Sequence, residues 1–208
     1  MSTLLHISSS PRDTASDSLA LAQAFLDSHQ AVRPEVNVET VDLFDGSLPQ
    51  FGRLAAGAKM AVFGGGQPTP EQSGEWDSAR TIFDRFADAD SYLFSVPMWN
   101  GGVPYVLKQW IDIITQPGWA FGFDPATGYS GLLHGKKAAV VYTSGVYSVG
   151  APPAYGRDFH STFFTDWLHF VGIDQVTEIR WQPTVLTATR DEDRAAALER
   201  ATEAGRTF

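Results

Sequence analysis

The sequence predicts one α/β domain, residues 1–208, built on a parallel sheet with helices on both faces. Segments with β-strand character alternate along the chain with segments of helical periodicity, which is the pattern of successive β-α-β units. Some strands, such as residues 136–143, are nearly continuous apolar runs, as expected for strands buried on both faces. A length of 208 residues suits a single domain, and neither a linker nor a repeat divides the chain.

Each element has a local signal. Ser16 or Asp17 can cap the first helix, Pro70 opens a later one, and Gly172 suits the position after a helix end. Trp119, Phe121 and Phe123 alternate ahead of a turn at 124–128, which is typical of a hairpin, while glycines 64–66 form a connector. The expected strands are residues 3–7, 36–43, 90–96, 136–143 and 175–181, and the expected helices are 19–26, 54–62, 70–86, 106–114, 159–171 and 191–204.

Composition excludes several classes of function. A net charge of −9 argues against a nucleic-acid binder and against binding to an anionic membrane surface. The absence of cysteine excludes disulfides, thiol nucleophiles and cysteine-ligated metals. No apolar run is long enough to span a membrane and no signal peptide is visible, so we expect a cytoplasmic protein. The aromatic content of 12% fits either a rich core or an apolar pocket and oligomer interface.

The loop after the first strand is dense in hydroxyl groups. Residues 8–18 include Ser10, Ser16 and Ser18 directly before a helix, whose free N–H groups and dipole favour a phosphate. The segment has neither the glycine pattern of a dinucleotide fingerprint nor a P-loop lysine. The carboxylate of Asp17 would repel a phosphate unless it points away, and the alternative is a serine-rich loop that only caps its helix.

Two further loops follow strand ends. Residues 97–104 combine Pro97, Met98 and Trp99 with an Asn-Gly-Gly segment, and Thr143 begins a polar loop after the fourth strand. A sheet order of 2-1-3-4-5 makes strands 1, 3 and 4 adjacent, so the three loops would converge on one crevice. A phosphate socket beside two partly aromatic walls suits a flat heterocycle with a phosphorylated tail, and FMN fits that description.

The same motifs carry a family resemblance. Pro97-Met98-Trp99-Asn100, followed by Pro104 and Leu107-Lys108-Gln109, resembles the Pro-Met-aromatic-Asn loop of the FMN-dependent NADH:azoreductase family. That family lies in the NAD(P)H:quinone reductase group of flavodoxin-like folds. The likeness extends to Ser9-Ser10 with Ser16-Asp17-Ser18, to Gly135-Lys136-Lys137 and to Thr143-Ser144-Gly145, and so spans nearly the whole chain.

The resemblance implies a flavodoxin-like, doubly wound, five-stranded parallel sheet of order 2-1-3-4-5. It implies an enzyme that passes hydride from NADH or NADPH through flavin N5 to a quinone or azo acceptor by a ping-pong mechanism. Members are homodimers with the active site at the interface. The implied FMN-binding residues are Ser10, Ser16, Asp17 and Ser18 at the phosphate; Pro97, Met98, Trp99, Asn100 and Gly101 at the ribityl chain and ring; and Thr143, Ser144, Gly145 and Val146 at the pyrimidine end.

Some positions depart from the family pattern. Gly101 stands where an aromatic residue is usual, Val146 interrupts the usual Gly-Gly, and Ser144 occupies a position that is sometimes arginine. These departures affect the expected substrate rather than the fold.

Aromatic and histidine side chains supply the remaining candidates. Trp119, Phe121 and Phe159 are candidates for substrate stacking, and the alternative is packing over the core. His134, His160 and His169 are conceivable proton donors, although each also suits a structural role. Because the cofactor carries the redox chemistry, we expect no catalytic side chain and no metal.

Three other readings remain open. They are a flavodoxin-like electron carrier, a biosynthetic flavin reductase with a dedicated substrate, and a hydrolase or cofactor-free binding module. No catalytic triad supports the last.

Overall fold

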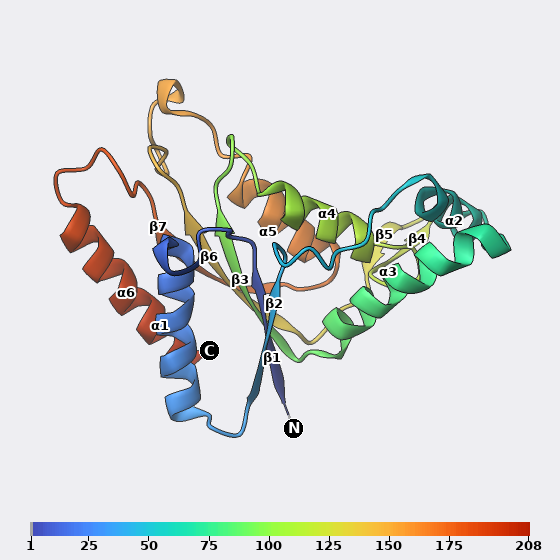
Figure 1. Cartoon of the computed structure of the whole chain (residues 1–208), viewed down its shortest axis with the longest axis horizontal. Helices are drawn as coiled ribbons and strands as arrows, with labels where there is room; N and C mark the ends of the chain where they lie inside the picture. Colours follow the sequence, from blue (N-terminus) through green and yellow to red (C-terminus); the bar gives the residue numbers. More distant parts are fainter. Residues whose placement is uncertain (1) are drawn as a thin grey trace.

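The computed structural model describes residues 2–208 and contains a five-stranded parallel sheet of order β2-β1-β3-β6-β7 (Figure 1). This order confirms the sequence prediction, in which the same strands are numbered 2-1-3-4-5. A separate two-stranded antiparallel hairpin, β4–β5, also forms as expected. The strands are β1 (Thr3–Ser8), β2 (Asn37–Asp42), β3 (Ser91–Pro97), β4 (Phe121–Asp124), β5 (Gly128–Gly131), β6 (Lys137–Thr143) and β7 (Gln175–Trp181).

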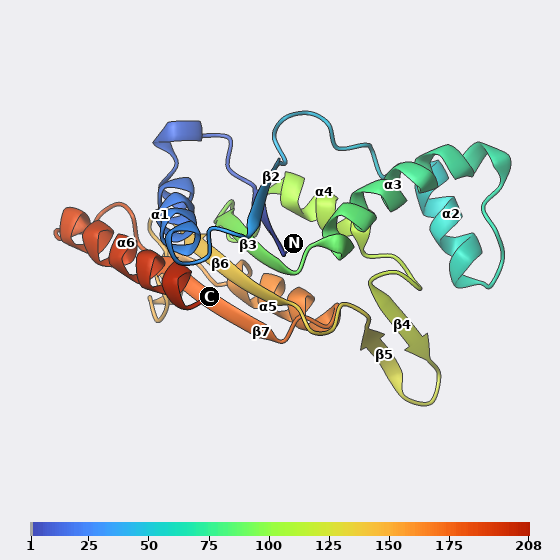
Figure 2. The same ribbon diagram turned by 90° about the horizontal axis from the view of Figure 1, so that it is seen from below.

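Helices cover the sheet from two sides. One buried cluster joins α1 and α6 to the sheet, and a second joins α3, α4 and α5 to the other side of it. Figures 1 and 2 show α1 and α6 side by side, while α2, α3 and the hairpin extend away from the sheet. The helices are α1 (Asp17–Val32), α2 (Arg53–Phe63), α3 (Pro70–Asp88), α4 (Tyr105–Ile114), α5 (Ser161–Phe170) and α6 (Arg190–Thr207), with 3-10 turns η1 (Asp13–Ala15) and η2 (Pro153–Tyr155).

Particular residues fix where the helices begin and end. Ser16 is the N-cap of α1, and its Oγ accepts a hydrogen bond from the Leu19 N–H at 3.3 Å. Gly172 follows α5 with φ +99°, a conformation that glycine adopts without steric cost. The helix predicted over residues 159–171 is slightly shorter in the structure. α5 starts at Ser161, and Phe159 lies in the preceding loop.

No helix within residues 2–208 has both the length and the apolar character needed to cross a membrane.

Close helix packing sets a clear requirement at one glycine. Gly205 lies in α6 against α1, and a Cβ added there would collide with the carbonyl group of Phe25. Gly74 is also within a helix, α3, but is exposed and has nothing near its missing Cβ.

These two glycines give opposite predictions. Gly205→Ala should lower the free energy of unfolding by about 1–3 kcal/mol, because the backbone of α1 must move. Gly74→Ala should raise it by up to about 1 kcal/mol, because alanine favours the helix. Urea denaturation measures both. An unchanged free energy of unfolding in Gly205→Ala would contradict the described contact between α1 and α6.

Candidate functional site

The three loops singled out from the sequence meet at one edge of the sheet. β3 pairs in parallel with β1 on one side and β6 on the other, so their carboxyl ends are adjacent. Hydrogen bonds continue beyond the strands: the N–H and Oγ of Ser9 both donate to the Ser95 carbonyl, at 3.2 and 2.6 Å. The Met98 N–H donates to the Thr143 carbonyl at 2.7 Å. The loops are thus fixed to one another by backbone contacts.

A cavity of about 200 Å³ lies between these loops. Most of the predicted cofactor residues line it, whereas Asn100, Gly101 and Val146 do not. Three further residues complete the wall: Arg12, Thr184 and Val185. The lining residues are Ser10, Arg12, Ser16, Asp17, Ser18, Pro97, Met98, Trp99, Thr143, Ser144, Gly145, Thr184 and Val185.

The additional wall comes from the loop after β7. The Thr184 N–H donates to the carbonyl oxygens of Ser144 and Gly145 at 2.9 and 3.0 Å, and the Val185 N–H donates to Gly145 at 3.1 Å. The sequence contains a signal for this contact in the order of its strands. The fifth predicted strand lies next to the fourth and runs parallel to it. Its carboxyl end therefore lies at the same edge of the sheet as the three loops.

The α1 end of the cavity has the groups that an anion requires. The hydroxyl oxygens of Ser16 and Ser18 are 3.1 Å apart, both side chains are buried, and both lie at the N-terminus of α1. Helix N–H groups and hydroxyls there can donate hydrogen bonds to a phosphate. Arg12 adds a positive charge to the lining. Asp17 adds a negative one, whose carboxylate oxygen lies 3.6 Å from the guanidinium of Arg190.

A tight turn shapes the second loop. The N–H of Trp99 donates to the carbonyl of Gly102 at 2.8 Å, and the reverse bond is 2.9 Å long. Between them, Asn100 has φ +51° and Gly101 has φ +83°. Two successive positive φ values are characteristic of turns that favour Asn-Gly. This conformation explains why glycine, rather than an aromatic residue, occupies position 101.

A wider groove adjoins the cavity. It has a volume of about 850 Å³. Trp99 lines both the groove and the cavity, whereas Asn100 lines the groove but not the cavity. Its other lining residues are Phe51, Lys59, Val103, Tyr105, Lys108, Gln109 and Asp112. The indole of Trp99 packs against Phe44 and Tyr105, with ring centroids 5.8 and 6.1 Å away. An aromatic plane therefore stands at the junction of the two volumes.

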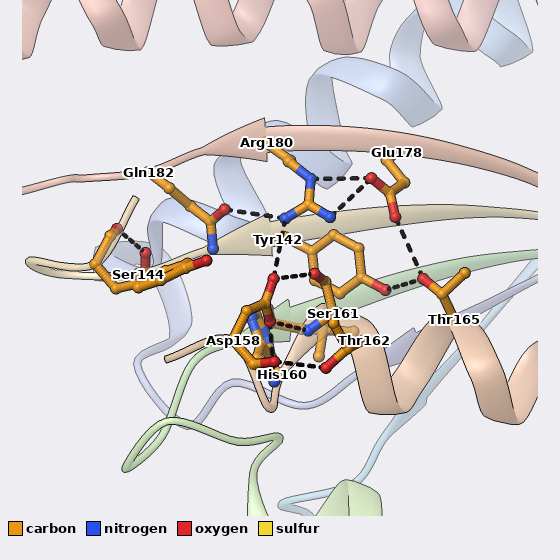
Figure 3. A network of polar contacts seen from close by, with 12 residues as sticks. Tyr142, Ser144, Asp158, His160, Ser161, Thr162, Thr165, Glu178, Arg180 and Gln182 are labelled. Atoms are coloured by element: carbon orange, nitrogen blue, oxygen red, sulfur yellow. Dashed lines mark hydrogen bonds and ion pairs between the residues drawn. The ribbon is translucent and has the colours of Figure 1, made fainter. Parts of the chain in front are cut away.

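A polar network joins the start of α5 to side chains of β6 and β7, as Figure 3 shows. The buried His160 donates from Nε2 to the Val96 carbonyl at 2.8 Å, immediately before Pro97. Asp158 accepts from the N–H groups of His160 and Ser161 at 3.1 and 2.7 Å, and so caps the start of α5. Burial lowers the pKa of His160 to about 4.

Further polar contacts lie within and beside the third loop. Ser144 Oγ donates to the Tyr147 carbonyl at 2.5 Å. The guanidinium of Arg180 lies 4.8 Å from the centre of the Tyr142 ring and pairs with Glu178 at 2.8 Å. Val146, by contrast, is exposed beyond the cavity wall.

The predicted substrate-stacking residues are dispersed. Phe121 is buried in the hairpin against Phe170, and Trp119 packs at a tilt against Trp76 with ring centroids 4.5 Å apart. Neither lines the cavity or the groove within one chain. Phe159 is exposed beside the second loop, where its N–H donates to the Gly101 carbonyl at 3.2 Å.

The histidines proposed as proton donors lie elsewhere: His134, His160 and His169 are absent from the cavity lining. Within residues 2–208 no cluster of three or more His, Asp or Glu side chains is placed to hold a metal ion.

The sheet order, with a crevice between β1 and β3, defines the class as a flavodoxin-like α/β protein. The chain belongs to the family described as having the flavodoxin-like fold, whose profile matches residues 2–204. This confirms the resemblance drawn from the sequence.

Relatives and solved structures cover almost the entire chain. An FMN-dependent NADH:quinone oxidoreductase of Ruegeria pomeroyi is 48% identical over 97% of both chains. Its counterpart in Desulfotalea psychrophila is 40% identical over 95% of this chain and 92% of that one. A Bacillus anthracis Sterne azoreductase structure has a TM-score of 0.91 at 25% identity, covering both chains completely. A Bacillus anthracis FMN-dependent NADH-azoreductase in complex with FMN has a TM-score of 0.85 at 25% identity, covering 100% and 99%.

Protonation of His160 gives a pH prediction. Its folded pKa of about 4 lies below the ordinary 6.5, so the unfolded chain binds the extra proton first as pH falls. Stability is therefore complete above pH 6.5 and is lost progressively toward pH 4, by up to about 3 kcal/mol from this residue. His160→Gln, which retains a donor for Val96, should flatten this loss in urea titrations across that range.

His134→Gln is the control, because His134 is exposed. It should keep the wild-type slope of stability against pH. If His160→Gln keeps the wild-type slope as well, His160 is not buried in its neutral form.

Proposed function

We propose that this chain is an FMN-dependent oxidoreductase that transfers hydride from NAD(P)H to a quinone or azo acceptor. The observation that carries the proposal is the convergence of the loops after β1, β3 and β6 on one cavity with a phosphate-type end and an aromatic wall. The relatives are named for the same activity.

The chemistry of the cavity fits FMN. Hydroxyl groups, the N-terminus of α1 and Arg12 suit a phosphate, whereas Met98 and Trp99 suit a flat ring. At about 200 Å³ the cavity is smaller than the roughly 300–1,000 Å³ typical of pockets for whole organic ligands. We therefore assign the phosphate and ribityl chain to the cavity and the ring to its junction with the groove at Trp99.

Each loop then has a separate role. Ser10, Ser16, Ser18 and the amide of Asp17 hold the phosphate. Pro97, Met98 and Trp99 cover the ribityl chain and ring, while Asn100 and Gly101 form the turn that presents Trp99. Thr143, Ser144 and Gly145 approach the pyrimidine end, with Val146 at the exposed rim.

When bound, FMN would supply the redox chemistry, which is hydride transfer between NAD(P)H and the acceptor. The protein contributes binding, orientation and electrostatics. Arg12 and Asp17 are the charged side chains of the cavity lining. The groove that meets the cavity at Trp99 adds the charged side chains of Lys59, Lys108 and Asp112.

We further propose a homodimer in which the partner covers the ring. Exposed aromatic side chains at the distal hairpin support it: Phe123 is 51% exposed and Tyr129 is 59% exposed, and their rings are 4.9 Å apart. Phe63 of α2 extends the same patch, 6.3 Å from Phe123. Contiguous exposed aromatic surface of this kind favours an interface. In such a dimer the hairpin of one chain, rather than Trp119 and Phe121 within the same chain, would supply aromatic contacts.

An electron carrier of the same fold needs no such patch, which favours the enzyme over the carrier. One experiment separates them. Purified protein reconstituted with FMN should be yellow, bleach rapidly with NADH and recover its colour when a quinone or azo dye is added. A protein that binds FMN but is not reduced by NADH or NADPH would support the carrier. A protein that cannot be loaded with FMN would refute both.

Ser18 tests the phosphate assignment. Within residues 2–208 its hydroxyl has one recorded hydrogen-bond partner, Ser16 Oγ, and the side chain is buried at the cavity wall. Ser18→Ala should weaken FMN binding by about 10- to 100-fold, the value of one hydrogen bond to a charged group. Ser78→Ala, on the exposed side of α3, should leave the dissociation constant unchanged. Equal affinity of the Ser18 variant and the wild type, measured by fluorescence titration, would place the phosphate elsewhere.

Asn100 tests the ring assignment. Asp tolerates the positive φ of this turn position, so Asn100→Asp adds charge without disturbing the loop. A negative charge beside an anionic cofactor should weaken FMN binding several-fold at low salt. Asn37→Asp, exposed on β2, makes the same charge change away from the site. Identical FMN affinities in the two variants would show that the ring does not lie beside Asn100.

A further inference from the structure

The phosphate end of the cavity contains a negatively charged side chain that needs an explanation. Asp17 lines the cavity beside the serine hydroxyls, in a chain whose net charge is already −9. A carboxylate this close to a phosphate repels it unless a cation screens the charge. The ion pair recorded for the Asp17 carboxylate is with Arg190, at 3.6 Å.

Arg190 contacts Asp17, Thr184 and Trp181 at the same time, and its Nη1 also lies 3.9 Å from the Asp191 carboxylate. It is the first residue of α6, far from Asp17 in the sequence. While its Nη2 faces Asp17, its Nε donates to the Thr184 carbonyl at 2.9 Å. Its guanidinium also lies 5.3 Å from the centre of the Trp181 ring. Thr184 itself belongs to the cavity wall and is bonded to the third loop.

We propose that Arg190 is a positioning residue of the cofactor site, which draws the Asp17 carboxylate toward α6 and neutralises it so that the cavity can accept a phosphate. This inference rests on the proposed FMN function and specifies its electrostatics. Arg190 also ties the loop after β7 to the start of α1, through its contacts with Thr184 and Asp17.

Arginine suits this role better than lysine. Its fixed fork presents Nε to Thr184 and Nη2 to Asp17 at the same time, and its plane can lie over Trp181. The side chain is 45% exposed, so the ion pair contributes little to the stability of the fold. Its main consequence is at the phosphate, where one uncompensated charge changes ligand affinity.

The test separates charge neutralisation from a purely structural tie. The variants are Arg190→Gln, Asp17→Asn and the double variant, with Arg206→Gln as a matched control at the opposite end of α6. The dissociation constant of FMN is measured for each at about 10 mM and about 0.5 M salt, which span strong and weak screening of exposed charges.

We expect Arg190→Gln to weaken FMN binding by about three- to tenfold at low salt, as for one partly screened charge, and by less at high salt. Adding Asp17→Asn should restore the affinity to within about twofold, since no charge is left to neutralise. Arg206→Gln should bind as the wild type does. If Arg190→Gln does not fold, Arg190→Lys, which keeps the charge, should retain most of the affinity while Asp17→Asn alone loses none.

Other results would overturn the proposal. A loss that persists at high salt and is not rescued by Asp17→Asn would make Arg190 only a structural tie. Wild-type affinity in Arg190→Gln, weaker binding in Asp17→Asn alone, or weak binding in Arg190→Lys where that variant is needed, would also contradict it. Failure of the wild-type protein to bind FMN would instead refute the proposed function, so the two failures are distinguishable.

Discussion

The site depends on backbone hydrogen bonds that join the loops beyond the ends of the strands. Ser9 bonds to Ser95, Met98 bonds to Thr143, and Thr184 bonds to Ser144. Each of these contacts continues the parallel pairing of the sheet past its last regular residue, in the order β1, β3, β6 and β7. The main chain therefore holds the cavity walls in place. The side chains at the site are not needed to join the loops and can contact a ligand instead.

This arrangement resolves the conflict between an acidic protein and an anionic cofactor. The chain carries a net charge of −9, yet the N-terminus of α1, the buried serines and Arg12 are concentrated at one small cavity. The remaining acid in that cavity, Asp17, is paired with Arg190. These local hydrogen-bond donors offset the repulsion between the negatively charged protein and an anionic cofactor. Binding of the cofactor would then depend on contacts inside the cavity rather than on long-range electrostatic attraction.

Most of the fold and much of the candidate cavity could be predicted from local patterns. Apolar runs located β3 and β6, and hydroxyl-rich or proline-bounded segments identified the loops that line the cavity. What escaped prediction depends on contacts between distant parts of the chain. Thr184 and Val185 join the cavity only through bonds to the third loop, and Arg190 meets Asp17 only because α1 and α6 pack together.

Side-chain exposure in the hairpin was equally unpredictable. Alternation alone places Trp119, Phe121 and Phe123 on one face. Packing against Phe170 buries Phe121, while Phe123 remains open. At position 101 the reason for glycine is a backbone angle of +83°, which a sequence comparison of side chains does not reveal.

Hydrogen–deuterium exchange of the protein with and without FMN tests the central claim most directly. The account predicts that FMN slows amide exchange in residues 9–18, 97–102, 143–146 and 184–185 together, because these segments form one continuous wall. Binding of FMN with protection confined to other segments, or to just one of these loops, would contradict the assignment of the cavity between β1, β3 and β6 as the cofactor site.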